Sequence, residues 1–160
     1  MCTVESPIGE LTLVADADGL TAIHFEDEHK RSIPTDLPVD PDHPILVQTA
    51  RQLEEYFDGE REEFDIPLHL TEGTDFEREV WQVLATIPFG QTISYGEQAA
   101  AVGRPGGAQA VGAANGQNPI AIVLPCHRVI GANRSMVGFG GGVPMKVWLL
   151  DHESGTQRLF

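Results

Sequence analysis

The sequence predicts two units: a small α/β unit over residues 1–73, with an antiparallel sheet and one helix, and a mainly α unit with a helix-turn-helix over residues 74–160. Two observations predict this division. Short β-branched runs separated by turn residues come first, and helix-capping patterns with helically spaced apolar residues follow. The charge changes with the pattern, because residues 1–80 hold 21 Asp and Glu against 5 Lys and Arg, whereas residues 81–160 hold 3 against 5.

In the first unit we expect four strands and one helix. Runs of apolar and β-branched residues place the strands at 4–6, 11–15, 20–25 and 64–70. The segment 26–42 is charged and proline-rich, which is typical of a loop. Asp42 is expected to cap a helix with Pro44 in its first turn and Gly59 at its end. The apolar face of this helix would consist of Leu46, Ala50, Leu53 and Phe57.

In the second unit two capping boxes open helices. Thr74-Asp75-Phe76-Glu77 starts a helix that runs to about Ile87, and Ser94-Tyr95-Gly96-Glu97 starts a short helix through Val102. A third helix spans about 107–115, and the two short helices predict a helix-turn-helix. The third helix is almost entirely Ala and Gly, so its backbone can closely approach either DNA or another helix.

The central stretch of the second unit holds one thiol at a fixed place. The apolar run 120–124 predicts a fully buried strand, which Pro125 ends because proline lacks an N–H for the sheet. Cys126 follows at once. Composition alone favours a buried and inert cysteine. His127 and Arg128 both favour a thiolate, so a nucleophilic cysteine and an inert one are then equally well supported.

A glycine-rich loop at 132–142 follows and is expected to form the lip of a pocket. Pro144 then opens a last helix, which has Glu153 at its end. The helix is expected to pack through Val147, Trp148 and Leu150.

Composition and charge exclude several classes of protein. No apolar run of about 18 residues and no secretory leader is present, so we expect a soluble, cytoplasmic protein. Two cysteines, Cys2 and Cys126, are too few for a disulfide framework. The net charge of −14 lies in the first half, which leaves the second half as the nucleic-acid candidate. Ordinary solubility or a high-salt habitat would explain the acidity equally well.

No zinc-type cluster of cysteines and histidines is visible, and we expect no metal site. Four histidines stand singly, each expected at the surface or with a satisfied partner: His24, His29, His43 and His69.

The segment Pro125-Cys126-His127-Arg128-Val129 resembles the active-site motif of the O6-alkylguanine-DNA alkyltransferases, also called methylated-DNA–protein-cysteine methyltransferases. The resemblance is strong over about residues 74–153 and holds only in outline over the first seventy. It implies a ribonuclease-H-like fold for the first unit and a winged-helix-like alkyltransferase domain for the second. Further matches at the family's spacing are Tyr95, Asn118-Pro119, Gly140-Gly141-Gly142 and the segment from Trp148 to Glu153.

This resemblance implies direct-reversal repair of double-stranded DNA, in which an alkyl group moves from O6-alkylguanine, or O4-alkylthymine, to Cys126. The family's series of cysteine, water, histidine and glutamate carries over to Cys126, His127 and Glu153. The spacing of the residues supports the water in this series. Cys126 and His127 are neighbours, and neighbours in an extended segment point to opposite sides, so a bridging water fits better than a direct hydrogen bond between them. No nearby group could remove the alkyl group from sulfur, so we expect one turnover per molecule. A monomer without cofactor is also implied.

The resemblance assigns roles to residues around the thiol. Tyr95 would stabilise the departing guanine, and Asn118 would tie the active-site turn to the recognition helix. The substrate-binding set would comprise Val129, Gly140, Phe139 and Arg128, the last as a structural residue. DNA contacts, made to a nucleotide flipped out of the stack, would come from Thr92, Ser94, Tyr95, Ala108, Gln109 and Ala113.

Two residues depart from the family's pattern. Gln109 stands where the family usually has an arginine that fills the space of the flipped base, so base extrusion and DNA affinity are expected to be weaker. Phe139 stands where a tyrosine is usual, and it keeps the ring but lacks the hydroxyl.

Three other functions fit parts of the sequence. A non-catalytic alkylation-lesion-binding protein of the same kind would have another residue, usually tryptophan, in place of Cys126. A cysteine hydrolase is disfavoured because Cys126 and His127 are adjacent. A transcriptional DNA-binding module would not need the thiol, and Cys126→Ser should leave its function intact. The cysteine itself therefore favours the alkyltransferase.

Overall fold

The computed structural model describes three stretches of the chain, with the backbone alone at positions 143 and 144: residues 1–25, 38–131 and 143–154. The glycine-rich loop expected at 132–142 lies outside these stretches, as does most of the loop expected at 26–42. No helix in the described stretches is both long enough and apolar enough to span a membrane.

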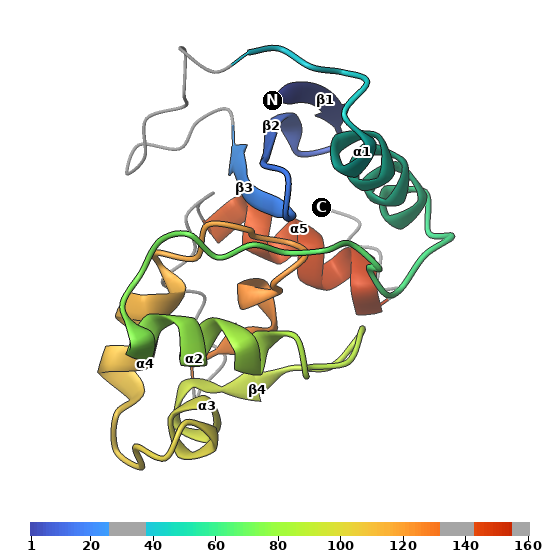
Figure 1. The fold of residues 1–160 in the computed structure, drawn as a ribbon. Coiled ribbons are helices and arrows are strands. Elements are labelled where there is room, and N and C mark those ends of the chain that lie inside the picture. The colour runs from blue at the N-terminus through green and yellow to red at the C-terminus, as the bar shows by residue number, and fades with distance from the viewer. Residues whose placement is uncertain (26–37, 132–142, 155–160) are drawn as a thin grey trace. The chain divides into compact units, whose positions relative to one another are not determined.

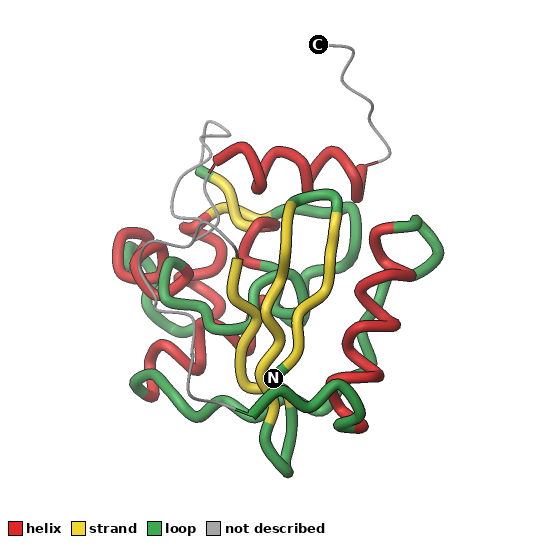
Figure 2. Tube along the Cα trace, turned by 90° about the horizontal axis from the view of Figure 1, so that it is seen from above, coloured by secondary structure: helices red, strands yellow, loops and turns green. Residues whose placement is uncertain are grey.

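The first of two compact units, Met1–Thr71, contains a three-stranded antiparallel sheet in the order β1-β2-β3 (Figures 1 and 2). Its strands are β1 (Cys2–Ser6), β2 (Gly9–Ala15) and β3 (Leu20–Phe25), which confirms the first three predicted strands. Leu13 of the central strand pairs with Ile23 of β3, and both side chains are buried.

Helix α1 (Pro44–Phe57) packs against this sheet. Its N-cap lies one residue after the predicted Asp42, because proline at the first helical position makes the preceding residue the N-cap. His43 fills that position, and its Nδ1 accepts a hydrogen bond from the backbone N–H of Ile45 over 3.2 Å. The buried face also differs, since Tyr56 rather than Phe57 is fully buried.

The strand expected at 64–70 is wrong. This segment makes a single bridge, Leu20 to Leu68, and the N–H of Leu20 donates to the carbonyl of Pro67 over 2.8 Å. A ladder cannot continue through Pro67 because proline has no N–H to donate. A Cβ at Gly19 would lie 2.7 Å from the same carbonyl oxygen, so this close approach requires glycine.

The second unit, Glu72–Phe160, begins with three helices: α2 (Asp75–Leu84), α3 (Tyr95–Ala101) and α4 (Ala108–Asn115). Both predicted capping boxes are present, at Thr74 and at Ser94. The helices α3 and α4 are the two short helices that the sequence predicts.

Two short strands that the sequence did not predict bring distant parts of this unit together. β4 (Ile93–Ser94) pairs in parallel with β5 (Val129–Ile130). Because β4 leads directly into α3 and β5 directly follows the 3₁₀ helix η1 (Cys126–Arg128), the start of α3 lies beside the cysteine segment. The last helix, α5 (Val143–Ser154), contacts η1.

The strand expected at 120–124 is also wrong. The backbone turns back on itself here, with the N–H of Leu124 donating to the carbonyl of Ile120 over 2.8 Å and Ile122 at a φ of +76°. The run is apolar because it is buried, as a strand would be, and a short apolar run does not reveal which of the two structures it forms. Ile120 and Ile122 are fully buried.

Candidate active site

Residues 118–125 form a closed turn ahead of Cys126, named here the cysteine turn. The side chain of Asn118 holds it closed, because its Nδ2 donates to the carbonyl of Leu124 over 2.8 Å and its Oδ1 accepts from the N–H of Ile120 over 3.0 Å. All three residues are buried, so these bonds replace contacts with water.

The resemblance implied that Asn118 ties this turn to the recognition helix. In the structure the link runs through the backbone, where the N–H of Asn118 donates to the carbonyl of Asn115, the last residue of α4, over 3.2 Å. The side chain makes its hydrogen bonds within the turn.

Cys126 begins the 3₁₀ helix η1 and is buried, with 4% of its surface exposed. Its N–H donates to the carbonyl of Leu124 over 2.8 Å, and its carbonyl accepts from the N–H of Val129. The sequence argument that Cys126 and His127 point to opposite sides assumed an extended segment. That assumption is wrong, because Cys126, His127 and Arg128 form one turn of 3₁₀ helix.

The Glu153 carboxylate at the end of α5 binds two residues of η1 at once. His127 Nε2 lies 2.7 Å from Glu153 Oε2, and Arg128 donates through Nε to Oε1 over 2.7 Å and through Nη2 to Oε2 over 2.9 Å. Burial acts to raise the pKa of Glu153, but the hydrogen bonds from His127 and Arg128 outweigh it and lower the pKa to about 2. The carboxylate is therefore ionised at neutral pH.

This arrangement decides which nitrogen of His127 can act as a base. An ionised carboxylate only accepts hydrogen bonds, so Nε2 carries a hydrogen. Burial lowers the pKa of His127 below its ordinary value, although Glu153 opposes the change, and a neutral ring then leaves the lone pair on Nδ1. The Nδ1 atom is buried and has no hydrogen-bond partner among the residues that the structure describes.

Tyr95, the first residue of α3, is half-buried, and the pairing of β4 with β5 places the start of α3 beside the cysteine segment. The pKa of Tyr95 is raised, first by burial and then by the charge of Cys126. Lys146 of α5 lies 3.3 Å from the tyrosine hydroxyl through its Nζ, which is a geometry for donation to that oxygen. Burial lowers the pKa of Lys146, while the negative charge of Cys126 acts to raise it.

Lys146 is the site residue that the sequence analysis missed. The predicted packing residues of the last helix were Val147, Trp148 and Leu150, which are only half-buried. The buried face is Lys146, Leu149 and Glu153, with exposures of 1%, 0% and 6%. These residues occupy positions i, i+3 and i+7 of one helix face. Counting back along this face from Glu153 therefore leads to Lys146.

The residues assigned to DNA lie on α4, at the start of α3 and in the segment that leads through β4 into α3. Gln109, Ala113 and Thr92 are exposed, and Ala108 is half-buried. The hydroxyl of Ser94 accepts from the N–H of Glu97 as the cap of α3.

The residues assigned to the substrate are less uniform. The guanidinium of Arg128 is buried and engaged with Glu153 and, through Nη1, with the carbonyl of Ile87 over 2.6 Å. Val129 is buried. Phe139 and Gly140 lie outside the described residues.

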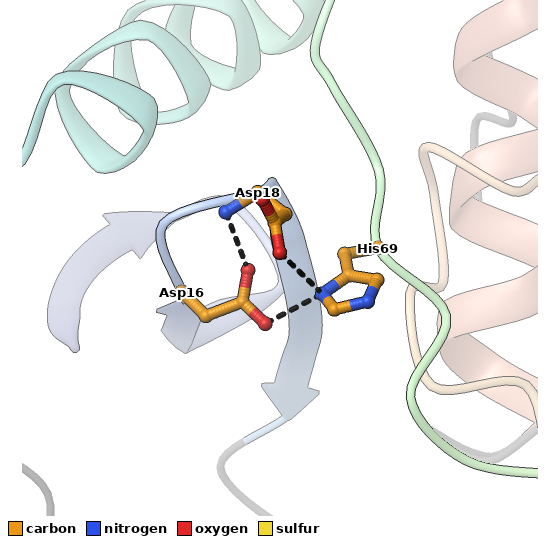
Figure 3. A group of neighbouring side chains, drawn as sticks. All are labelled: Asp16, Asp18 and His69. Atoms are coloured by element: carbon orange, nitrogen blue, oxygen red, sulfur yellow. Dashed lines mark hydrogen bonds and ion pairs between the residues drawn. The ribbon is translucent and has the colours of Figure 1, made fainter.

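Among the described residues, one group of side chains of the types that bind metals lies in the first unit. Asp16, Asp18 and His69 place one ligand atom each within 4.8 Å of one another (Figure 3). His69 Nδ1 lies 2.6 Å from Asp16 Oδ2, while Asp16 Oδ1 accepts from the N–H groups of Asp18 and Gly19. Asp16 is thus bonded to His69 and to the backbone of its own turn, while the exposed Asp18 lies 4.0 Å from His69 Nδ1 through its Oδ2. His69 was expected at the surface or with a hydrogen-bond partner, and Asp16 is that partner.

Both halves of the chain match family models. Residues 75–155 match the 6-O-methylguanine DNA methyltransferase DNA-binding domain, and residues 2–70 match the ribonuclease-like domain of the same family. The two matches agree with the predicted fold class for both units.

Individual relatives give the same result. The methylated-DNA–protein-cysteine methyltransferase of Mycobacterium tuberculosis is 48% identical over 151 residues, covering 94% of this chain and 90% of the relative. The protein of that name from Methanosarcina acetivorans is 44% identical over 149 residues, covering 93% and 94%. A crystal structure of M. tuberculosis OGT in complex with DNA matches with a TM-score of 0.88 at 47% identity, covering 96% of this chain and 92% of that one.

Proposed function

Because the chain belongs to the family of methylated-DNA–protein-cysteine methyltransferases, we propose that it repairs alkylated DNA by direct reversal. The alkyl group moves from O6 of guanine to Sγ of Cys126. The bond between carbon and O6 breaks, a bond between carbon and sulfur forms, and the repaired guanine remains in the DNA. The same chemistry applies to O4 of an alkylated thymine.

The observation that supports this proposal best is the buried pair of Glu153 and His127, with His127 next to Cys126 in η1. The carboxylate holds His127 with a hydrogen on Nε2, which leaves Nδ1 as the base. His127 takes the thiol proton of Cys126 through a water molecule, and the thiolate attacks the alkyl carbon. A thiolate suits this step because it is a strong nucleophile for an sp³ carbon.

Tyr95 acts on the leaving group. Its raised pKa keeps the hydroxyl protonated, and Lys146 binds its oxygen. The hydroxyl can then donate to the departing guanine, which gains negative charge as the bond to the alkyl carbon breaks. We assign Tyr95 as the catalytic hydrogen-bond donor and Lys146 as the residue that positions it.

Cys126 is too deeply buried to reach a base within a duplex, so the alkylated nucleotide must leave the stack. The exposed small residues of α4 allow its backbone to approach the DNA, with Gln109 on the same helix beside the space that the base vacates. Thr92 and Ser94 contact the DNA backbone, and Val129 borders the base.

The protein acts once, as a monomer. The thioether that forms on Cys126 is a poor leaving group, and Cys126, His127 and Glu153 all come from one chain. We place the protein in the cytoplasm, where cellular reductants keep a thiol such as Cys126 reduced.

The test is mass spectrometry of the protein after incubation with a duplex that carries one O6-methylguanine. We expect a gain of one methyl group on the Cys126 peptide, saturating at one per protein, and no gain for Cys126→Ser. Binding of the duplex without any gain in mass would support a lesion-binding protein instead. Absence of both binding and transfer would overturn the proposal.

A further inference from the structure

Two buried amide side chains join α3 to α4, apart from the site described above. Gln98 of α3 and Asn115 of α4 are 0% and 2% exposed. The two amides bind each other reciprocally: Gln98 Nε2 donates to Asn115 Oδ1 over 3.0 Å, and Asn115 Nδ2 donates to Gln98 Oε1 over 2.7 Å. A cyclic amide pair of this kind restricts both the distance and the relative rotation of the two helices.

Further hydrogen bonds connect the same region to α2. Gln98 Nε2 also donates to the carbonyl of Val80 over 3.3 Å, and Trp81 Nε1 donates to the carbonyl of Ala114 over 2.8 Å. Directional bonds from two helices therefore meet at the C-terminal end of α4.

Apolar packing gives α4 little control over its rotation. Its sequence is AQAVGAAN, and Val111 is its one large apolar side chain. Small side chains do not interlock with a neighbouring helix, so neighbouring rotations of α4 differ little in buried apolar area. The amide pair supplies the directional restraint that the helix's own composition lacks.

We propose that Gln98 and Asn115 are positioning residues for alkyl transfer from duplex DNA. The pair fixes the rotation of α4 and thereby the direction in which Gln109 and Ala113 face the DNA. This inference rests on the proposed function, because it requires that α4 contacts DNA. Neither amide touches the substrate, since both are buried within the helical unit.

The site around Cys126 does not depend on these side chains. Asn115 contacts the cysteine turn through its backbone carbonyl, which accepts from the N–H of Asn118. A substitution at Asn115 that changes only the side chain keeps this bond. Loss of the amide pair should therefore reduce transfer from duplex DNA more than transfer from a free base.

The test compares two substrates: a duplex with one O6-methylguanine, and the free base O6-benzylguanine, which offers no phosphates to α4. The quantity measured is the second-order rate constant for alkylation of Cys126 by the duplex, divided by the same rate constant for the free base. Q98L/N115L should melt near the wild-type temperature, since removing both polar partners together leaves no unpaired amide. Its ratio should nevertheless fall by about tenfold, as expected for a small misplacement of the bound DNA.

Two variants control this result. Q98N/N115Q keeps one shorter and one longer amide, and it should recover most of the lost ratio. Gln82→Leu changes an exposed amide on α2 and should leave both rate constants unchanged. A wild-type ratio in Q98L/N115L would overturn the proposal, as would an equal fall with both substrates. If neither substrate alkylates Cys126 of the wild-type protein, the proposed function fails, and this inference fails with it.

Discussion

Glu153 is the residue on which the charge of the site depends. It is almost fully buried, yet it accepts from His127 and from two nitrogens of Arg128. Removing one member of such a buried charged group leaves the others without their partner, which is far more costly than losing an exposed ion pair. Glu153 therefore serves the stability of the second unit as well as the state of His127.

Glu153→Gln should lower the free energy of unfolding at pH 7 by about 3 kcal/mol, because Arg128 is left buried without its counter-ion. The folded pKa of about 2 lies below the ordinary 4.5, so the stabilisation is complete above pH 4.5 and is lost as the pH falls toward 2. Urea unfolding at a series of pH values should show the difference between wild type and variant shrinking over that range. Glu79→Gln, at an exposed position, is the matched control, and a difference that persists unchanged at low pH would contradict the assignment.

Lys146→Met should slow alkyl transfer at pH 7 by about tenfold, equivalent to about 1.4 kcal/mol. The variant removes the donor to the Tyr95 hydroxyl and the positive charge whose attraction favours a thiolate at Cys126. Alkylation of Cys126 by iodoacetamide, measured against pH, should rise at a higher pH than in the wild type. Lys146→Gln keeps a donor without the charge and separates the two effects. An unchanged pH profile in both variants would exclude a role for the charge.

At the scale of single elements, the cysteine turn is the structure that places the thiol. It contains Ile122 at a φ of +76°, a conformation that β-branched residues rarely adopt. Burial of the Ile122 side chain offsets this backbone strain. Burying an isoleucine stabilises the folded state by about 2 kcal/mol, which is comparable to the cost of the left-handed conformation. The turn is held by Asn118 at one end and leads into η1 at the other.

Asn118→Ala should destabilise the second unit by about 2 kcal/mol, because the N–H of Ile120 loses its partner in a buried turn and the carbonyl of Leu124 keeps only the N–H of Cys126. Transfer from duplex DNA and from the free base should fall by the same factor, since the turn serves both reactions. Thermal melting and the two rate constants measure this. Asn118→Asp keeps the acceptor and loses the donor, so it should lie between wild type and alanine. A loss confined to duplex DNA would contradict the role given to the turn.

Elements that depend on local chemistry could be predicted from the sequence, and elements that depend on distant partners could not. The boxes at Thr74 and Ser94 involve residues three positions apart, and both were correctly placed. The segments 64–70 and 120–124 were wrongly predicted as strands, because alternation and apolar content do not reveal whether a neighbouring strand is present. Of the two site residues on α5, Glu153 was identified through the resemblance, and Lys146 was not recognised.

At the scale of the whole molecule, charge limits how DNA can be bound. Residues 1–80 have a net charge of −16 and residues 81–160 a net charge of +2. In the second unit Arg128 and Lys146 are buried and bind other protein groups, so they are not available to phosphates. The basic residues that remain in positions 72–160 are Arg78, Arg104, Arg134 and Arg158.

DNA binding should therefore depend only weakly on salt. With at most these four cations at phosphates, a plot of log Kd against log salt concentration should have a slope of about 4 or less. Fluorescence anisotropy of Cys126→Ser with a labelled duplex would measure it without the complication of alkyl transfer. Arg104→Gln, at an exposed position, should reduce the slope by about 1 if that residue binds a phosphate. A slope above about 6 would require contacts from outside the second unit.

The position of Glu153 on α5 also has a consequence for the timing of synthesis. Cys126 and His127 leave the ribosome before α5 does, so the nascent chain carries the thiol before the carboxylate that orients the histidine has been made. The reactive centre is then assembled by the docking of a late helix rather than by the formation of its own segment. The hydrogen bonds that fix His127 and Arg128 therefore form only after the last helix has been synthesised.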